Sequence, residues 1–341
     1  MKMKKYPKIS VVFVIYNGER TIEDCLRLLF EQDYPKDKLE IIAADGGSTD
    51  KTLGIIKKYQ KKYPGIIKLI DNPGKYKVGK GMGADIASQK ATGEFILMID
   101  QDNLLTQKNW LRDMVEILIK NKDISSVQSL TLIPKECSIM DRYLGAIGIE
   151  DPFAIPYSLK SQVLLYPKRF IYNSSEKFYV YTINRNSFYY GGDNGFLIRK
   201  KDFFDNGGYT QDIDNFYRMA LANKKYNVAV PSNLFVFHKT SSEFFDFVKK
   251  RGFYVRYYLR SNIKDRNFYW ISLKKNTFRQ NLKFIKNIIF SMIIIPRLFE
   301  GIKMAIKQKE VSWLMHPIVS FAVTLNYIYS FIAVKIFKKK N

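Results

Sequence analysis

Short apolar runs alternate with helical patterns through the first half of the chain, and this alternation restricts the fold more than any other feature. Runs of five to seven residues that are apolar throughout or at every second position predict strands. Apolar positions three and four residues apart, lying between these runs, predict helices that cover a sheet. The strand candidates are residues 9–15, 39–44, 66–70, 94–99 and 124–130. The pattern predicts an α/β fold with a mostly parallel sheet and flanking helices.

Two of the helical patterns are clear enough to assign a buried face. Their apolar positions are Ile22, Cys25, Leu26 and Leu29 in the first, and Leu53, Ile56 and Tyr59 in the second. We expect Ser48 and Thr49 to cap the N-terminus of the second helix. Cys25 and Cys137 are far apart in sequence, so we interpret both as reduced residues in or near a core, as in a cytosolic protein.

Polar loops follow three of the predicted strands, at residues 16–19 (YNGE), 44–50 (ADGGSTD) and 100–103 (DQDN). In open α/β sheets, ligands bind outside the carboxyl ends of the strands. The three loops therefore predict one binding crevice.

Asp100 and Asp102 are separated by one residue at the end of the apolar run 94–99. Two carboxylates this close repel each other unless a cation or a proton neutralises them. Magnesium and manganese prefer oxygen ligands and are commonly held by one or two carboxylates together with substrate phosphates. A D-x-D triplet alone is also compatible with a solvated turn, so its neighbours must decide between the two interpretations.

Farther along, residues 188–200 (FYYGGDNGFLIRK) are typical of a strand that begins with a glycine-rich close approach, followed by a short helix and a turn at 206–209 (NGGY). Residues 211–226 have helical spacing, with Asp212 and Asp214 in the first turn, where negative charge suits the helix dipole. On its own, Asp212 is adequately explained by this helix-terminal position.

The last hundred residues combine positive charge with apolar stretches. The chain has 56 Lys and Arg against 32 Asp and Glu, a formal net charge of +24, which calls for a polyanionic partner or an anionic surface. Residues 241–260 mix aromatic and basic side chains, as at membrane interfaces and nucleic-acid surfaces. Residues 288–295 and 313–334 are strongly apolar, and the second stretch is long enough to span a bilayer.

Spanning topologies conflict with the charge of this region. A single span from a cytoplasmic domain would export the basic tail, and a hairpin would export the lysines of residues 300–312. We therefore expect helices that lie in the membrane interface or enter one leaflet; two core helices of a soluble protein are the alternative. The expected domains are a catalytic domain at 1–240 and membrane-associated helices at 241–341.

A nucleic-acid-binding protein would also explain the positive charge. No helix-turn-helix, zinc-ligand spacing or RNP-like pattern is present in the sequence, however. We therefore expect no nucleic-acid partner.

An ordered set of motifs gives the D-x-D its context: residues 11–35, 39–52, 91–103, 211–218 and 235–242. In order and spacing this set resembles the inverting family-two glycosyltransferases, which have the GT-A fold, over roughly residues 8–245. Each motif is modest, but the ordered set is specific. The resemblance implies a nucleotide-sugar donor, either a UDP- or a GDP-sugar, and a Mn²⁺ or Mg²⁺ cofactor.

The resemblance implies a role for individual residues of the donor site. Asp45 stands where the family binds the nucleotide base, with Asn17 and Glu19 in the bordering loop. Asp100 faces the ribose or the metal, and Asp85 lies near the donor. Three residues of the chain depart from the family pattern: Asp85 replaces a common Asn, Gly46 a frequent second Asp, and Gln211 the Glu that usually precedes the base.

The resemblance also implies the residues of catalysis and metal binding. Asp102 would bind the metal that bridges the donor diphosphate, together with Asp100, and His238 stands where many members place a further metal or diphosphate contact. Asp212 stands at the position of the general base. The alternative for His238 is a polar residue at a strand end whose hydrogen bonds are made within the protein.

Together these features predict a metal-dependent, inverting glycosyltransferase at the cytoplasmic face of the cell membrane, with an anionic membrane surface as a partner. The acceptor would be lipid-linked or an envelope glycan. Its predicted contacts are Arg251, Arg256 and Asn194, the arginines being suited to the acceptor's phosphates. An inactive membrane scaffold with a GT-A-like domain is the alternative, because Gln211 and Asp85 depart from the family.

Overall fold

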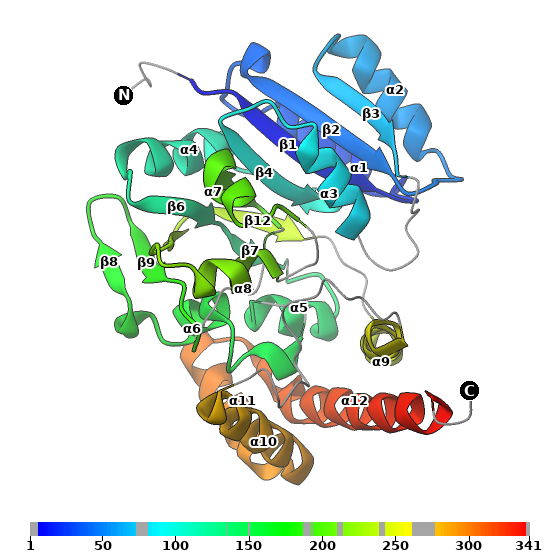
Figure 1. The fold of residues 1–341 in the computed structure, drawn as a ribbon, viewed down its shortest axis with the longest axis vertical. Coiled ribbons are helices and arrows are strands. Elements are labelled where there is room, and N and C mark those ends of the chain that lie inside the picture. The colour runs from blue at the N-terminus through cyan, green and yellow to red at the C-terminus, as the bar shows by residue number, and fades with distance from the viewer. Residues whose placement is uncertain are drawn as a thin grey trace. The chain divides into compact units, whose positions relative to one another are not determined.

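The computed structural model describes residues 6–72, 81–133, 135–148, 151–186, 192, 194–209, 214–238, 243–260 and 277–338 (Figure 1). The chain divides into two compact units. The first unit comprises Met1–Leu132 and Pro167–Lys239, and the second comprises Ile133–Tyr166 and Thr240–Asn341.

A mostly parallel sheet forms the centre of the first unit. Within the described residues it has nine strands in the order β3-β2-β1-β4-β10-β6-β11-β9-β8. β1 lies parallel to β2 and β4, and β10 runs antiparallel between β4 and β6. The strands are β1 (Ile9–Ile15), β2 (Leu39–Asp45), β3 (Ile67–Asp71), β4 (Phe95–Asp100), β6 (Ile124–Gln128), β8 (Ile171–Asn173), β9 (Phe178–Thr182), β10 (Phe196–Arg199) and β11 (Asn227–Pro231).

The predicted α/β fold class is confirmed, and each predicted strand of the first half is present within a residue or two of its expected bounds. β1 and β2 are buried at every position, as all-apolar runs in a parallel sheet require. The helices of this half are α1 (Ile22–Phe30), α2 (Thr52–Lys62), α3 (Gly81–Gln89) and α4 (Trp110–Lys120).

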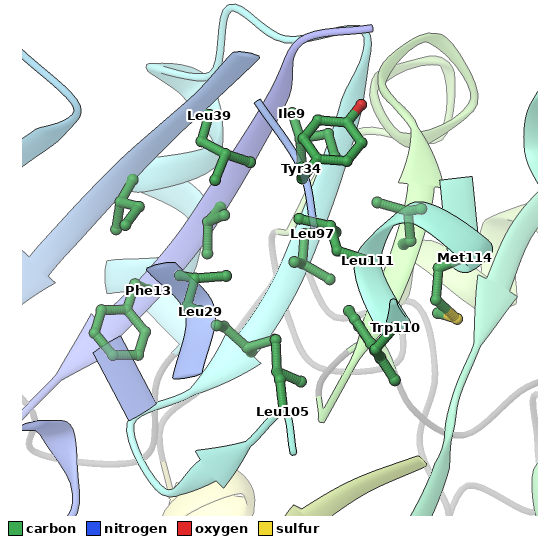
Figure 2. Packing of buried hydrophobic residues seen from close by; sticks show 14 of the residues in the cluster. Ile9, Phe13, Leu29, Tyr34, Leu39, Leu97, Leu105, Trp110, Leu111 and Met114 are labelled. Carbon is green, nitrogen blue, oxygen red and sulfur yellow. The ribbon is translucent and has the colours of Figure 1, made fainter. Parts of the chain in front are cut away.

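The predicted apolar face of α1 is buried and packs on the sheet. In Figure 2, Phe13 of β1, Leu29 of α1 and Leu97 of β4 lie in one core with Trp110 of α4. Cys25 is buried in this core and Cys137 is half-buried; both are free thiols, as expected.

The prediction that Ser48 and Thr49 cap α2 is wrong. α2 begins at Thr52, and the Asp50 carboxylate accepts from the Thr52 backbone N–H at 3.0 Å. The Ser48 hydroxyl instead donates to Asp45 at 2.6 Å, because the loop curls back on the end of β2 before the helix starts.

A small second sheet lies beside the carboxyl end of β4. It consists of β5 (Asn103–Leu104), β12 (Phe235–His238) and β7 (Leu130–Leu132). β12 pairs antiparallel with β5, so that His238 lies opposite Asn103. The polar residue that ends β12 is thereby brought to the D-x-D segment.

The predicted helices after β10 are present as α7 (Lys200–Asp205) and α8 (Asp214–Leu221). Between them, the Asn215 side chain donates to the carbonyls of Phe203, Asn206 and Gly208 at 3.0–3.1 Å. These bonds fix the turn at residues 206–209, where Gly207 and Gly208 have positive φ. Asp212 lies outside the described residues.

The second unit is helical. Its elements are α5 (Ile139–Ala146), α6 (Leu159–Leu165), α9 (Phe244–Arg260), α10 (Phe278–Ile293), α11 (Ile295–Gln308), the 3₁₀ turn η4 (Val311–Met315) and α12 (His316–Lys338). Tyr143 and Leu144 of α5 share a core with Trp313, Val319 and Val323.

This core groups residues 133–166 with the C-terminal helices, whereas the sequence analysis placed them in a domain at 1–240. The physical reason is the packing of α5 on η4 and α12, which joins segments about 170 residues apart. The C-terminal part of the second unit begins at Thr240, beside the expected division. Among the described residues, one helical stretch, Val311–Ile336, has the length and composition to cross a membrane.

Candidate functional site

Hydrogen bonds join the loop after β1 to the loop after β2. They involve Asn17 and Glu19, two residues of the predicted site for the nucleotide sugar. The Asn17 side-chain oxygen accepts from the Thr49 N–H at 2.9 Å, and the Glu19 carboxylate accepts from the Lys51 N–H at 3.1 Å. In return, the Glu19 N–H donates to the Asp50 carboxylate at 3.0 Å. Asn17 has a φ of 45°, a conformation that Asn tolerates better than most residues. Both side chains therefore fix the shape of the two loops at this edge of the sheet.

Asp45 ends β2 and organises its own loop. Its carboxylate accepts from the Gly47 N–H at 3.0 Å, from the Ser48 N–H at 3.1 Å and from the Ser48 hydroxyl. Gly47 has a φ of 90°, which only glycine adopts readily. Hydrogen bonds of this kind fix a carboxylate in one orientation. A ligand at this edge would meet a fixed acceptor.

Asn103 organises the D-x-D segment and was missed in the sequence analysis. It is fully buried, and its side-chain oxygen accepts from the Asp100 N–H at 3.0 Å. Its amide nitrogen lies 2.9 Å from the Asn194 side-chain oxygen and 3.4 Å from an Asp102 carboxylate oxygen. The only indication in the sequence was that Asn103, a polar residue, directly follows Asp102. The turn geometry that gives it this role is not visible in sequence spacing.

Gln101, the residue between the two acids, was also missed. Its side-chain oxygen accepts from the Tyr16 N–H at 3.0 Å, and its amide nitrogen donates to the Tyr16 carbonyl at 2.9 Å. These two bonds link the D-x-D segment to the loop after β1. The carboxyl ends of β1, β2 and β4 thus form one connected edge, as predicted.

Asp102 and His238 lie in direct contact at this edge. The His238 Nε2 atom is 3.2 Å from an Asp102 carboxylate oxygen, and the two residues are 136 positions apart in sequence. The His238 side chain is 8% exposed and that of Asp102 is 29% exposed. The imidazole is therefore held inside the protein while the carboxylate reaches the surface.

This pair suits a divalent ion that is shared with a phosphorylated ligand. No cluster of three or more acidic, histidine or cysteine side chains suited to a metal occurs in the described parts of the chain. A fully protein-bound ion is thus not supported there. One or two carboxylates with substrate phosphates are, however, a usual set for Mg²⁺, and Mn²⁺ also suits oxygen ligands. The Asp100 and Asp102 carboxylates fit this chemistry, and His238 contacts Asp102.

Cys25 lies beneath the D-x-D, with its sulfur 3.6 Å from the Asp100 carbonyl oxygen. Burial raises the pKa of the Cys25 thiol well above its usual range, and the negative charges of Asp102 and Asp100 raise it further. The thiol is therefore neutral, and it acts as a packing residue rather than a nucleophile or a metal ligand.

The remaining predicted site residues are distributed between the two units. Asp85 lies on α3, where burial raises the pKa of its carboxyl, although a hydrogen bond from Gln89 at 3.0 Å opposes the shift. Asn194, predicted to contact the acceptor, has a φ of 51° and lies against Asn103 at the D-x-D.

Arg251 and Arg256 belong to α9 of the second unit. The Arg251 guanidinium lies 4.9 Å from the centre of the Phe247 ring, and Arg256 donates to the Ser330 hydroxyl at 2.8 Å. The roles predicted for these residues and for Asp212 stay predictions.

Comparison with known proteins finds a family similarity in the first half of the chain. Residues 10–170 match the model of the glycosyl transferase family 2. Over 107 residues the chain is 38% identical to a poly(ribitol-phosphate) beta-glucosyltransferase of Bacillus spizizenii, a match that covers 31% of this chain and 16% of that protein.

A second relative comes from an archaeon. Over 55 residues the chain is 51% identical to a dolichyl N-acetyl-alpha-D-glucosaminyl phosphate 3-beta-D-2,3-diacetamido-2,3-dideoxy-beta-D-glucuronosyltransferase of Methanococcus voltae. This match covers 16% of this chain and 17% of that protein. The chain therefore spans about a sixth of the length of these two relatives.

Among solved structures, the fold is similar to that of the mannosyltransferase PcManGT from Pyrobaculum calidifontis in complex with GDP-Man and Mn²⁺. The TM-score is 0.54 at 17% identity, and the match covers 96% of this chain and 88% of that one. The GT-A fold predicted from the sequence motifs is confirmed.

Proposed function

We propose that this chain, whose residues 10–170 match the model of the glycosyl transferase family 2, is a metal-dependent, inverting glycosyltransferase that uses a nucleotide-sugar donor. The observation that carries this proposal is the connected polar edge at the carboxyl ends of β1, β2 and β4, where Asp102 and His238 are 3.2 Å apart. Ligands bind at this edge in open α/β sheets.

The donor would lie along this edge. Asp45, held by its own loop, would accept a hydrogen bond from the nucleotide base, with Asn17 and Glu19 fixing the loops around it. Asp100 would face the ribose or the ion. The mannosyltransferase with a similar fold was solved with GDP-Man, and a UDP- or GDP-sugar is the donor class we propose here.

Asp102, with Asp100 and His238, would hold Mn²⁺ or Mg²⁺ against the donor diphosphate. When bound, the ion supplies Lewis-acid stabilisation of the charge that develops on the leaving group. His238 would orient the Asp102 carboxylate, since groups that contact a metal ligand fix its geometry.

Asp212 would act as the general base. Its carboxylate would take the proton of the acceptor hydroxyl as the hydroxyl oxygen forms a bond to the anomeric carbon of the sugar. On the opposite face, the bond from the anomeric carbon to the diphosphate oxygen breaks, and the nucleoside diphosphate leaves with the electron pair. Attack opposite the leaving group inverts the anomeric centre. The base is carried by the segment that leads into α8.

We propose a lipid-linked or envelope-glycan acceptor, reached at the cytoplasmic face of the membrane. One relative is named for a poly(ribitol-phosphate) acceptor and another for a dolichyl phosphate-linked sugar, so phosphate occurs in both names. The guanidinium groups of Arg251 and Arg256 are suited to phosphate oxygens. Asp85 and Asn194 would lie at the donor and acceptor ends of the crevice.

A donor screen tests this proposal. Thermal unfolding of the purified chain would be followed with UDP-, GDP- and dTDP-sugars, each with and without Mn²⁺. We expect one donor to raise the unfolding temperature only when Mn²⁺ is present, and Asp102→Asn to abolish the shift. The matched control is Asp37→Asn, whose side chain is 75% exposed and lies far along the chain from the D-x-D. No shift with any donor would favour the inactive scaffold instead.

A further inference from the structure

The three C-terminal helices each expose a stripe of large apolar side chains. The spacing in each stripe follows steps of three, four or seven residues, which place the side chains on one face of a helix. On α10 the exposed residues are Phe278, Leu282, Ile285, Ile289 and Ile293; on α11 they are Ile295, Leu298, Phe299, Ile302 and Ile306; on α12 they are Ile318, Leu325, Tyr329, Ile332 and Ile336.

On α10 and α11, the residues that face the protein lie opposite the apolar stripe. Asn287 and Ser291 are the buried residues of α10, and both are two positions from exposed Ile289. Two positions on an α-helix correspond to about 200° of rotation, so the buried and exposed sets point in opposite directions. Met304 of α11 stands in the same relation to Ile302 and Ile306. The inner side of α10 is therefore polar and its outer side apolar, the reverse of a surface helix in water.

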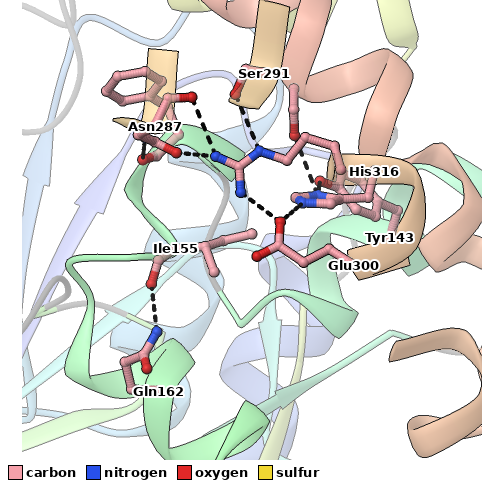
Figure 3. Close-up of polar contacts among 10 residues, drawn as sticks. Tyr143, Ile155, Gln162, Asn287, Ser291, Glu300 and His316 are labelled. Carbon is pink, nitrogen blue, oxygen red and sulfur yellow. Dashed lines mark hydrogen bonds and ion pairs between the residues drawn. The ribbon is translucent and has the colours of Figure 1, made fainter. Parts of the chain in front are cut away.

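A buried polar network holds the inward faces together. The Arg297 side chain, 4% exposed, donates to the Ser291 hydroxyl at 3.3 Å and to the Glu300 carboxylate at 2.6 Å, and it also contacts the Asn287 side chain. Figure 3 shows Asn287 and Ser291 of α10 in this network, with Glu300 beside His316.

The same network continues into α12 and α5. The His316 Nε2 atom lies 3.4 Å from the Glu300 carboxylate, and the Nδ1 atom lies 2.7 Å from the Tyr143 hydroxyl. Four helices are thereby pinned by polar contacts on their inner sides (Figure 3). The network prevents the helices from rotating to bury their apolar stripes.

The charged residues of these helices are mostly basic. Residues 277–338 contain nine Lys and Arg and two acids, Glu300 and Glu310. Both acids are paired within the unit, Glu300 with Arg297 and Glu310 with Arg142. Arg279, Lys286 and Lys303 are exposed on α10 and α11, within one turn of the apolar stripes. Apolar residues flanked by lysine and arginine are typical of a helix that lies in an anionic membrane interface.

We propose that the apolar stripes of α10, α11 and α12 form a lipid-binding surface that lies in the plane of an anionic bilayer. The inference rests on the membrane association included in the proposed function and gives it a surface. The stripes would be buried to the depth of the headgroup and acyl boundary, and the flanking basic side chains would meet lipid phosphates.

The inner face of α12 distinguishes this arrangement from a transmembrane span. The Tyr327 hydroxyl donates to the Asp151 carboxylate, and Asn326 donates to the Val248 carbonyl of α9. Ser330 accepts from Arg256 at 2.8 Å. A spanning helix would have to give up these partners and place its polar side chains in hydrocarbon, which is costly.

The same charges argue against a second copy of the chain as the occupant of this surface. In a symmetric dimer, identical patches face each other, so the basic side chains on one would oppose those on the other. Anionic lipid, in contrast, neutralises them.

Vesicle binding by the full chain tests the proposal. We expect strong partitioning onto vesicles of phosphatidylcholine with phosphatidylglycerol, and weak partitioning onto phosphatidylcholine alone. Ile306→Asp on α11 should weaken binding about tenfold, since it puts a charge into the lipid-facing stripe. The matched control is Ile171→Asp on β8: the two isoleucines are 74% and 76% exposed, and the control should stay within about twofold of wild type.

Ile289→Asp on α10 is the second variant, and unfolding in urea verifies that each variant is folded. The proposal would be overturned if Ile306→Asp and Ile171→Asp bound vesicles equally well. Retention of the wild-type chain on vesicles after alkaline carbonate extraction would overturn it in favour of a spanning helix. A dimer in sedimentation velocity that only Ile306→Asp dissociates, without vesicle binding, would overturn it in favour of a second copy. Vesicle binding without any sugar transfer would support this surface while contradicting the proposed enzyme activity.

Discussion

The two units of the chain differ in the side chains that they expose. In the first unit the strands β1 and β2 are buried at every position, and polar side chains such as Asn17, Asp45 and Asp102 gather where the strands end. In the second unit Arg297 and His316 are buried, while large apolar side chains are exposed on three helices.

This difference in exposed side chains suits the two units to different surroundings. Burial of apolar surface is the main favourable contribution to folding in water, and the first unit follows that rule. A unit that pins polar groups inside and exposes apolar stripes is suited to a surface that is less polar than water. Breaking the polar edge of the first unit should remove chemistry, whereas breaking the polar interior of the second should remove stability.

The largest effect is expected at Asp102. Asp102→Asn removes a charge from the proposed ion site, and we expect it to lower sugar-transfer turnover by about 10²- to 10³-fold, as for other groups that stabilise developing charge. Release of nucleoside diphosphate measures turnover. Asp37→Asn should leave the rate unchanged. Equal rates in the two variants would contradict a role for the D-x-D.

The polar interior of the second unit is probed by Arg297→Met. This change leaves Asn287 and Glu300 without the guanidinium and should lower the free energy of unfolding by about 2–4 kcal/mol. Since the Glu300 side chain is 43% exposed, water compensates part of the loss and the lower end is expected. Urea unfolding measures the change. Lys303→Met, at an exposed position of α11, is the control, and a change as large as that of Arg297→Met would refute the importance of the network.

The dependence of stability on acidic pH tests the contribution of Glu40, which lies near the start of β2, at the other end of the strand from Asp45. Burial alone would raise the pKa of Glu40, but hydrogen bonds from Ser10, Thr92 and Lys8 lower it to about 2. Lys8 and Lys68 both form ion pairs with this carboxylate. A depressed carboxyl pKa stabilises the fold above the unfolded value near 4.5, and the contribution is lost as pH falls through about 2. We expect about 2 kcal/mol, because both lysines are largely exposed.

Glu40→Gln removes this titrating group. Between pH 4.5 and 2 the free energy of unfolding, measured in urea, should fall less steeply in the variant than in wild type. Parallel curves would show that Glu40 does not contribute.

A smaller effect is expected at His238. The imidazole contacts Asp102 rather than forming a complete metal cage, so His238→Gln should weaken Mn²⁺ binding by about tenfold, as is typical for groups that orient a metal ligand. Titration with Mn²⁺ in the presence of donor measures this. Unchanged affinity would assign His238 to strand-end packing.

The sequence predicted what depends on local pattern. All-apolar runs predicted β1, β2 and β4, and because the carboxyl ends of parallel strands share one edge, the polar loops could be assigned to one crevice. The expected cap at Ser48 was wrong, since its hydroxyl bonds to Asp45 across the turn instead. Which of several local hydrogen bonds a serine makes depends on a backbone path that sequence does not reveal.

Most of the features that the sequence did not predict depend on contacts between segments far apart in the chain. The contact of Asp102 with His238 depends on β12 pairing with β5, and residues 133–166 join the C-terminal helices because Tyr143 packs on Trp313. Neither contact has a local signal. The apolar character of the C-terminus was evident in the sequence. Which side of each helix faces outward could be seen only from the structure, where Arg297 contacts Ser291 and Glu300 on the inner side.

The most direct test of the central claim is calorimetric titration of UDP and GDP into the wild-type chain and into Asp102→Asn, with and without Mn²⁺. The account predicts that one nucleoside diphosphate binds the wild-type chain only with Mn²⁺, and that Asp102→Asn removes this metal-dependent binding. Binding of equal strength without the ion, or unchanged binding by Asp102→Asn, would contradict it.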